Sequence, residues 1–241
     1  MRLKNSLGLA LAVLALAASA VQAQAAAPAA AKAPPADKNV ILSFDADMTP
    51  GMQRRLATGK VAAWYDPAVV KLLEDEKLPA RIYVTGLFAE TYPDLVRHLT
   101  TLPGIVIGNH SYDHAAFESN CYGLRTLRTD QDKSAEITDA QAVIKRLTGV
   151  TPTLFRYPGL CRNAHDDALV ALSGLTIDEG NLTSSDAFNH SSKKIVHHVM
   201  SHAQDGSEIL FHLGGPNAPA TAAALGRIIP RLRALGFTFR S

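Results

Sequence analysis

Two short stretches of the chain carry residue types that can hold a metal ion. The first, SFDADMTP (43–50), contains Asp45 and Asp47, and the second, GNHSYDH (108–114), contains His110 and His114. Carboxylates and neutral imidazoles are good ligands for zinc and similar divalent ions. Three protein ligands leave one coordination position open for water, which is typical of a catalytic metal site. For either pair alone, ordinary loop residues are the alternative interpretation.

The position of these residues along the chain favours one shared site. Five polar residues lie at or just beyond the C-terminal end of an expected strand: Asp45, Asp47, His110, Arg156 and His212. In α/β barrels this is the face on which catalytic sites are built. The two histidines, spaced i and i+4, would point the same way if their segment turns helically after its strand.

The elements that must position these residues alternate between two types. Apolar, strand-like runs are expected at 40–44, 81–86, 104–109, 153–158, 175–180, 208–213 and 237–239. Helical patterns are expected over 66–77, 92–100, 129–149, 164–173, 190–203 and 220–236. This alternation predicts an α/β fold with a parallel sheet and helical crossovers. About seven units suit a closed barrel, and a doubly wound open sheet is the alternative.

The N-terminal region has the pattern of an export signal. Basic residues precede an apolar run at 7–18, and a small-residue cleavage motif ends at Ala23, so 1–23 is expected to be a signal peptide. The run is shorter than the roughly 20 residues of a membrane span, which makes an uncleaved anchor the less favoured alternative. Residues 24–38 form an Ala/Pro-rich linker, and 39–241 form one domain. The protein is therefore expected to be periplasmic or secreted, with no stable membrane insertion after cleavage.

Charge and cysteine content narrow the partners and the compartment. The net charge is +2, and there is no basic block, so nothing indicates nucleic-acid binding. Cys121 and Cys161 are the two cysteines, and an oxidising compartment allows one disulfide between them. Two free thiols are the alternative. Apart from His110, His114 and His212, the chain has six histidines, and all six are expected on helix surfaces: His98, His165, His190, His197, His198 and His202.

Five short motifs in a fixed order give the chain a family resemblance. They are SFDAD (43–47), HSYDH (110–114), RYPG (156–159), SSDAF (184–188) and LFH (210–212). In this order they resemble the motifs of polysaccharide deacetylases of the NodB-homology type, carbohydrate esterase family 4. The resemblance covers about 40–240, and it implies a distorted (β/α) barrel of about seven parallel strands.

The resemblance also implies a metal site. His110 and His114 would bind a divalent metal, most often Zn²⁺, together with an aspartate of the first motif. We take Asp47 as that ligand because Ala46, which separates the two aspartates, cannot coordinate a metal. In an extended segment residues i and i+2 point to the same side, so both aspartates can face the metal.

Catalytic roles follow from the same motifs. Asp45 would be the general base and His212 the general acid in attack by a metal-activated water. Arg156 would hold the base carboxylate, and Asp186 would hold Arg156 in turn.

Three residues are expected to bind substrate: Tyr157, Gly159 and Leu210. A backbone N–H near Gly159 would stabilise the oxyanion. The fourth motif has no Trp, so Phe188 or Leu210 would supply the apolar wall of the pocket. If the second and third motifs converge, a Cys121–Cys161 bridge would pin their loops together.

The implied activity is metal-dependent removal of N-acetyl groups from amino sugars of a polysaccharide or oligosaccharide, such as chitin, peptidoglycan or poly-N-acetylglucosamine. Two alternatives keep the fold. One is an esterase or amidase that acts on O-acetyl or non-glycan substrates, and the other is a glycan-binding relative without turnover. A serine hydrolase is not indicated because the chain has no G-x-S-x-G motif.

Overall fold

The computed structural model describes residues 38–241. The expected signal peptide and nearly all of the expected linker lie outside the described residues. The strands are β1 (Lys38–Ala46), β2 (Ala80–Val84), β3 (Ile105–Asn109), β4 (Leu154–Phe155), β5 (Thr176–Ile177), β6 (Leu182–Thr183), β7 (Ser207–His212) and β8 (Phe237–Arg240). The helices are α1 (Pro50–Ala57), α2 (Pro67–Asp75), α3 (Gly86–Thr91), α4 (Pro93–Thr101), α5 (Asp130–Thr148), α6 (Ala164–Leu172), α7 (Ser192–His202) and α8 (Thr221–Ala234), with a 3₁₀ turn η1 (Pro158–Leu160).

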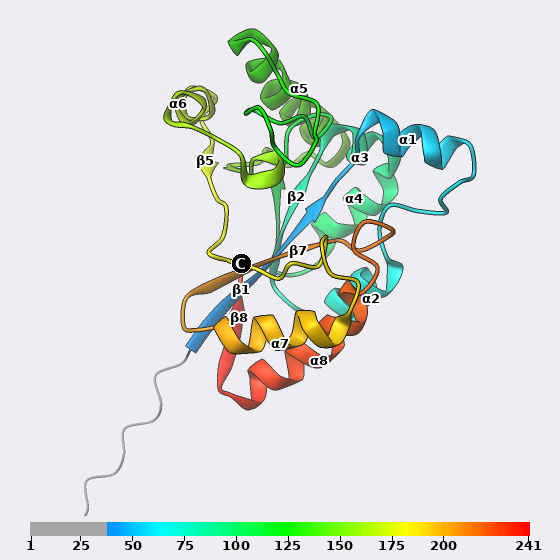
Figure 1. Cartoon of the computed structure of the whole chain (residues 1–241), viewed down its shortest axis with the longest axis vertical. Helices are drawn as coiled ribbons and strands as arrows, with labels where there is room; N and C mark the ends of the chain where they lie inside the picture. Colours follow the sequence, from blue (N-terminus) through cyan, green and yellow to red (C-terminus); the bar gives the residue numbers. More distant parts are fainter. Residues whose placement is uncertain (1–37) are drawn as a thin grey trace, which may run out of the picture. The chain divides into compact units, whose positions relative to one another are not determined.

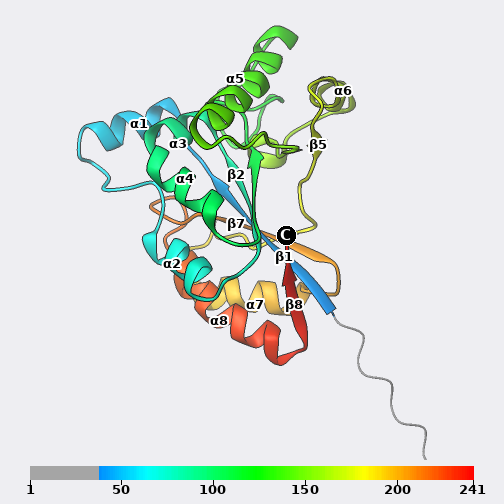
Figure 2. The same cartoon turned by 180° about the vertical axis from the view of Figure 1, so that it is seen from behind.

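The strands form one parallel sheet, as the sequence predicts, and the sheet curls into a barrel that is incomplete rather than closed. Seven strands follow the order β5-β4-β3-β2-β1-β7-β6, and β8 pairs with the start of β1. No pairing joins β5 to β6 within residues 38–241, so the barrel is open between its two edge strands. Helices α7 and α8 lie side by side, next to the start of β8 (Figure 1 and Figure 2).

Strand β1 is the centre of the sheet and has three partners. One of its edges pairs with β7 from Val40 to Asp45. The opposite edge is divided, because β8 pairs with residues 38–41 and β2 with residues 43–46. The strand that carries the first motif is therefore fixed from both sides over most of its length.

Alternation along β1 separates an apolar layer from a polar interior. Leu42 and Phe44 are fully buried in the main hydrophobic core, and the Phe44 ring stacks on Phe211 of β7 at 5.8 Å. Residues at i and i+2 of a strand share a face, so Ser43 and Asp45 point to the other side, into the barrel.

In the described part of the chain, no helix is long and apolar enough to cross a bilayer.

The expected helices are all present, with bounds that differ by a few residues. Helices α1 and α3 were not expected. Helix α1 buries no residue, so it has no apolar stripe to reveal it, and its start is set by Thr49, whose hydroxyl accepts from the Met52 amide. Helix α3 begins with four consecutive buried residues, which give no 3.6-residue period. The strand expected at 153–158 is confined to β4 because the η1 turn follows it.

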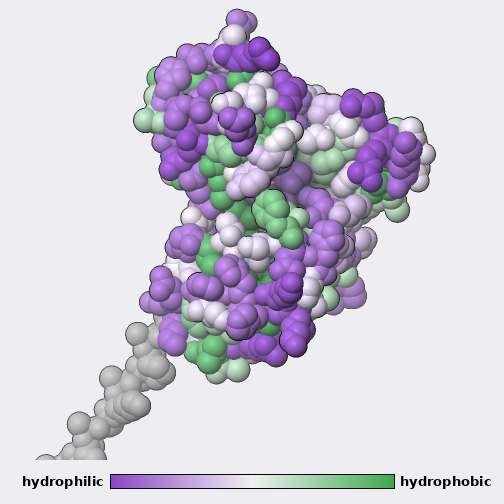
Figure 3. Space-filling model, viewed as in Figure 1, coloured by the Kyte–Doolittle hydropathy of each residue, from purple (hydrophilic) through white to green (hydrophobic). Residues whose placement is uncertain are grey.

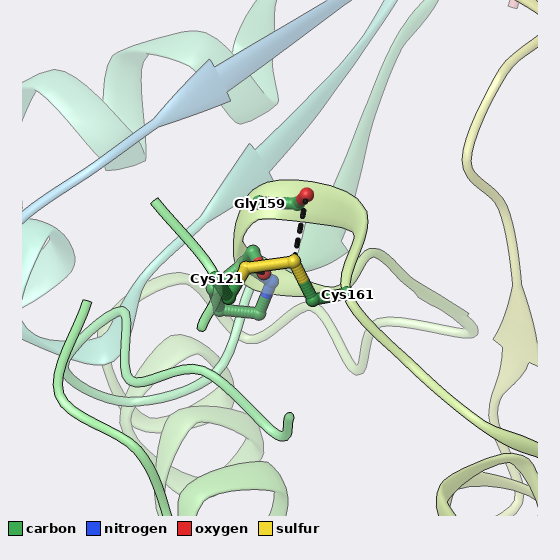
Figure 4. The surroundings of a disulfide bond; sticks show 4 residues. Cys121, Gly159 and Cys161 are labelled. Atoms are coloured by element: carbon green, nitrogen blue, oxygen red, sulfur yellow. Dashed lines mark hydrogen bonds between the residues drawn. A yellow bond between two sulfur atoms is a disulfide. The ribbon is translucent and has the colours of Figure 1, made fainter. Parts of the chain in front are cut away.

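A disulfide joins Cys121 to Cys161, as the convergence of the two motifs predicted. It ties the loop between β3 and α5 to the η1 turn (Figure 4). Gly159 in that turn has a φ of 65°, and a Cβ there would come within 2.5 Å of the Cys121 sulfur. Glycine is therefore required for this close approach.

Reduction of the bridge is expected to destabilise the domain by about 4 kcal/mol. The two cysteines are 40 residues apart, and closing a loop of that length removes chain entropy mainly from the unfolded state. The measurement is urea unfolding with and without reductant. An unchanged midpoint, or two alkylatable thiols in the non-reduced protein, would contradict the prediction.

Candidate metal and catalytic site

The polar residues at the strand ends converge on one site. Asp45, near the end of β1, is in register with His212, the last residue of β7. On the other side of β1, β2 leads to β3 and β4, so His110 and Arg156 follow neighbouring strands. The carboxyl ends of adjacent parallel strands meet at one edge of the barrel, which explains why residues far apart in sequence come together.

Asp47, His110 and His114 form a compact cluster of possible metal ligands. One ligand atom from each lies within 4.8 Å of the others. Nε2 of each histidine is 3.4 Å from Asp47 Oδ1. The i,i+4 spacing suggested that a helical turn brings the two histidines together, but the segment that carries them is not helical. The segment is irregular, and Ser111 and His114 have positive φ values of 66° and 63°.

The chemistry of this cluster fits a divalent cation. Nδ1 of His110 lies 2.8 Å from the carbonyl oxygen of Arg156, which can only accept, so Nδ1 carries a proton and, in the neutral ring, Nε2 presents its lone pair. Among residues 38–241, neither His110 Nε2 nor Asp47 Oδ1 has a hydrogen-bond partner, although both are buried. Burial opposes ionisation of Asp47, but the histidines around it outweigh burial and hold its pKa below the usual range. A carboxylate and an unprotonated nitrogen facing one point form a cation site.

Asp45 is held by a fully buried arginine. Arg156 Nη1 donates to Asp45 Oδ1 at 3.0 Å, and its Nη2 donates to Ser43 Oγ and Glu208 Oε1 at 3.0 and 2.6 Å. The other oxygen of Asp45, Oδ2, is 3.7 Å from His110 Nε2. Arg156 therefore fixes one carboxylate oxygen and leaves the other facing the cluster.

Asp186 contacts His212 and not Arg156, which corrects the role that the resemblance implied. Its Oδ1 lies 2.8 Å from His212 Nδ1, and its Oδ2 accepts from the His212 amide at 2.8 Å and from Thr221 Oγ1 at 2.6 Å. Burial alone would lower the pKa of His212, but Asp186, with Asp47 and Asp45, raises it to about 10. With Nδ1 bound to Asp186, Nε2 is the ring atom that faces the site, 3.7 Å from Asp47 Oδ2.

Asp186→Asn is expected to move the alkaline limb of the pH–rate profile to lower pH by about 1–3 units. A protonated His212 is needed to donate a proton, and the carboxylate raises the pKa of His212, so removal of its charge lowers that pKa. The measurement is the pH dependence of turnover, with metal content as the control. An unmoved alkaline limb would mean that another group titrates there.

A charged network inside the barrel was not predicted from the sequence. Arg81 Nη1 donates to both Asp178 and Glu208 at 2.7 Å, and the Tyr83 hydroxyl also donates to Asp178. Glu208 in turn binds Arg156. The alternation of side chains along a strand could have revealed these residues. Glu208 is an even number of residues from His212 on β7, so both point to the same face, and Arg81 and Tyr83 share one face of β2 for the same reason.

A cavity of about 700 Å³ opens over the cluster. Gly159, Leu210 and Phe188 line it. His190 lines it as well, and because this residue precedes α7, the expectation that it lies on a helix surface is wrong. Tyr157 does not line the cavity, contrary to expectation. It is fully buried, packs against Phe117 and Phe155, and directs its hydroxyl toward Asp167. Arg156 points into the barrel, so the next residue points away from it.

The fold and the site define the class of the protein: a parallel α/β barrel with a candidate metal site at the carboxyl ends of its strands. Sequence comparison gives the family. Residues 32–177 match the sequence model described as polysaccharide deacetylase, so the chain belongs to the polysaccharide deacetylase family. The matched region contains the first three motifs. Asp186 and His212 lie beyond it.

Known proteins similar to this chain share most of its length. A peptidoglycan-N-acetylglucosamine deacetylase of Bacillus cereus is 29% identical over 177 residues, which cover 73% of this chain and 78% of that protein. A chitooligosaccharide deacetylase of Sinorhizobium fredii is 28% identical over 189 residues, with 73% and 83% covered. The structure of a family 4 carbohydrate esterase from Streptomyces lividans in complex with acetate has a TM-score of 0.66 and 28% identity, and covers 84% of this chain and 92% of that one.

Proposed function

We propose that this chain is an exported, metal-dependent hydrolase that removes N-acetyl groups from amino sugars of a polysaccharide of the chitin, peptidoglycan or poly-N-acetylglucosamine type. The observation that carries the proposal is the Asp47–His110–His114 cluster, flanked by the Asp45–Arg156 and His212–Asp186 pairs in one cavity. The names of the similar deacetylases support the choice of substrate.

We assign Asp47, His110 and His114 as the residues that would hold the metal, and Zn²⁺ as the ion that suits them. Two imidazoles and one carboxylate form a ligand set of catalytic zinc sites, and such an ion supplies Lewis-acid activation of water near neutral pH. The carbonyl of Arg156 keeps the proton of His110 on Nδ1, so the ring presents Nε2 in the form that can coordinate.

Asp45 and His212 would carry the proton transfers. Asp45 takes the proton of the attacking water on Oδ2, while Arg156 keeps Oδ1 occupied. His212 then donates the proton on Nε2 to the amine nitrogen as it leaves, because Asp186 keeps the ring protonated and oriented through Nδ1. The two groups lie on adjacent strands in register, so both are placed to act on one acetyl group.

The remaining parts of the cavity would bind the acetyl group. A backbone N–H in the η1 turn near Gly159 is our choice for the donor to the oxyanion. Leu210 lines the cavity and provides apolar surface for the acetyl methyl group.

Acetate release by the metal-loaded protein tests this function. We expect release from N-acetylglucosamine oligomers or peptidoglycan, loss of activity on chelation, and recovery when Zn²⁺ is added back. His114→Ala is the matched control, because it removes a ligand without altering the Asp45–Arg156 pair.

Each of the other outcomes supports a different conclusion. Release only from O-acetylated glycans or from a non-glycan acetamide would favour the esterase or amidase alternative. Full activity in a sample verified to be metal-free would remove the metal from the proposal. A metal-loaded protein that binds glycans and releases acetate from none of these substrates would be a non-catalytic relative.

A further inference from the structure

Two large aromatic side chains lie exposed at the mouth of the cavity. Tyr122 is 70% exposed and Phe188 is 73% exposed, yet both line the cavity. They come from separate loops, one between β3 and α5 and the other between β6 and α7, and their ring centroids are only 5.4 Å apart. Figure 3 shows hydrophobic residues gathered in the middle of this face, between α6 and α7. Exposed apolar surface concentrated at one place marks a binding site.

The fold fixes the backbone that carries each of the two aromatic side chains. Tyr122 follows Cys121 of the disulfide, has a φ of 48°, and contacts the η1 turn opposite Gly159. Phe188 lies in a short turn closed by a hydrogen bond of 3.1 Å, in which the Phe188 amide donates to the Ser185 carbonyl oxygen. That turn contains Asp186, the partner of His212. Each aromatic residue is thus anchored beside a part of the candidate site.

The spacing of the rings restricts how a ligand can bind. A sugar ring between two aromatic rings needs a separation of about 7–8 Å, twice a normal carbon–carbon contact. The observed 5.4 Å is too short, and the rings are tilted by 43°. They form one continuous apolar surface, on which the flat C–H face of a pyranose can lie. Leu124 and Leu160 add apolar side chains to the lining of the same cavity.

The charge of the lining indicates which glycan fits. Among the described residues that line the cavity, none is Lys or Arg, whereas three are aspartates: Asp45, Asp47 and Asp186. The protonated His212 also lines the cavity, but it is already paired with Asp186, so a sugar that carries a carboxylate, such as muramic acid, would find no unpaired side-chain cation there. An uncharged N-acetylhexosamine chain avoids the cost of burying a carboxylate without a cationic partner.

We propose that Tyr122 and Phe188 form a stacking site for the sugar ring next to the one that is deacetylated, and that the protein selects uncharged N-acetylhexosamine oligomers over single sugars and over carboxylate-bearing glycans. This inference rests on the proposed deacetylase function. Binding energy gained on the neighbouring ring is available for orienting the reacting acetyl group, so the effect should reach turnover as well as affinity.

The test compares N-acetylglucosamine oligomers of one to five units with a muramic-acid-containing glycan, using the full chain loaded with Zn²⁺. We expect kcat/KM to rise at least tenfold from the single sugar to the oligomers. Tyr122→Ala and Phe188→Ala should each reduce this gain about fivefold to tenfold. Phe188→Tyr, which keeps an aromatic ring, should retain the gain of the parent protein. Leu172→Ala is the matched control, because Leu172 is 85% exposed and does not line the cavity.

Calorimetric affinity for the N-acetylglucosamine trimer, measured on the same proteins, separates the two proposals. Weaker trimer binding by both alanine variants without acetate release from the parent protein would support the stacking site and contradict the deacetylase function. Equal chain-length gain and equal trimer affinity in parent and alanine variants would overturn the stacking site. A preference for the muramic-acid-containing glycan would overturn the proposed selectivity.

Discussion

Asp45→Asn is expected to reduce kcat/KM by about 10²–10⁴-fold while the protein keeps its metal. Asparagine can still accept from Arg156 through its Oδ1, so the barrel interior is preserved. It cannot take up a proton at neutral pH, and the base is therefore lost. Metal content by elemental analysis and turnover by acetate release are measured on the same sample.

Asp47→Ala is the companion variant, and it should lose metal and turnover together. We expect its metal affinity to fall by more than about 100-fold, because loss of a ligand exceeds the effect of losing a residue that only supports one. The opposite pattern, in which Asp45→Asn loses the metal and Asp47→Ala retains it, would reverse the two roles.

Glu208→Ala is expected to destabilise the fold by about 3–5 kcal/mol. Glu208 accepts from Arg156, whose side chain is completely buried, and from Arg81. Alanine would leave two guanidinium groups of the barrel interior short of a counter-charge and would pack nothing in its place. The free energy of unfolding in urea is the measurement.

An exposed ion pair provides the control for Glu208. Lys71 and Asp75 pair at 2.8 Å on the surface of α2, with side chains 71% and 56% exposed, so Asp75→Ala should cost less than about 1 kcal/mol. If Glu208→Ala unfolds at the same urea concentration as Asp75→Ala, the interior network does not stabilise the barrel.

The barrel and the position of the site could be predicted because they depend on local patterns. Apolar runs alternate with helical patterns, and parallel strands bring their carboxyl ends to one edge whatever their order. The placement of Asp45, His110 and His212 at one edge follows from that rule. No knowledge of strand register was needed.

The partner of Asp186 could not be predicted in this way. Asp186 follows β6, a strand of two residues that shows no period, and β6 pairs with β7. Only this pairing brings Asp186 beside His212 and away from Arg156. Similarly, Ser111 and His114 adopt left-handed backbone conformations that no residue pattern indicated. Tyr157 was misplaced because strand parity beyond the two residues of β4 was not taken into account.

The three partners of β1 have a consequence for the order of folding. A nascent chain that has emerged as far as α5 already contains Asp45, Asp47, His110 and His114, but β1 then lacks β7 and β8. Contacts between segments so distant in sequence form late, because the intervening chain must first be closed into a loop. β1 gains its partner along Asp45 only when β7 is available, so we expect the growing chain to stay free of metal until the segment up to His212 has been made.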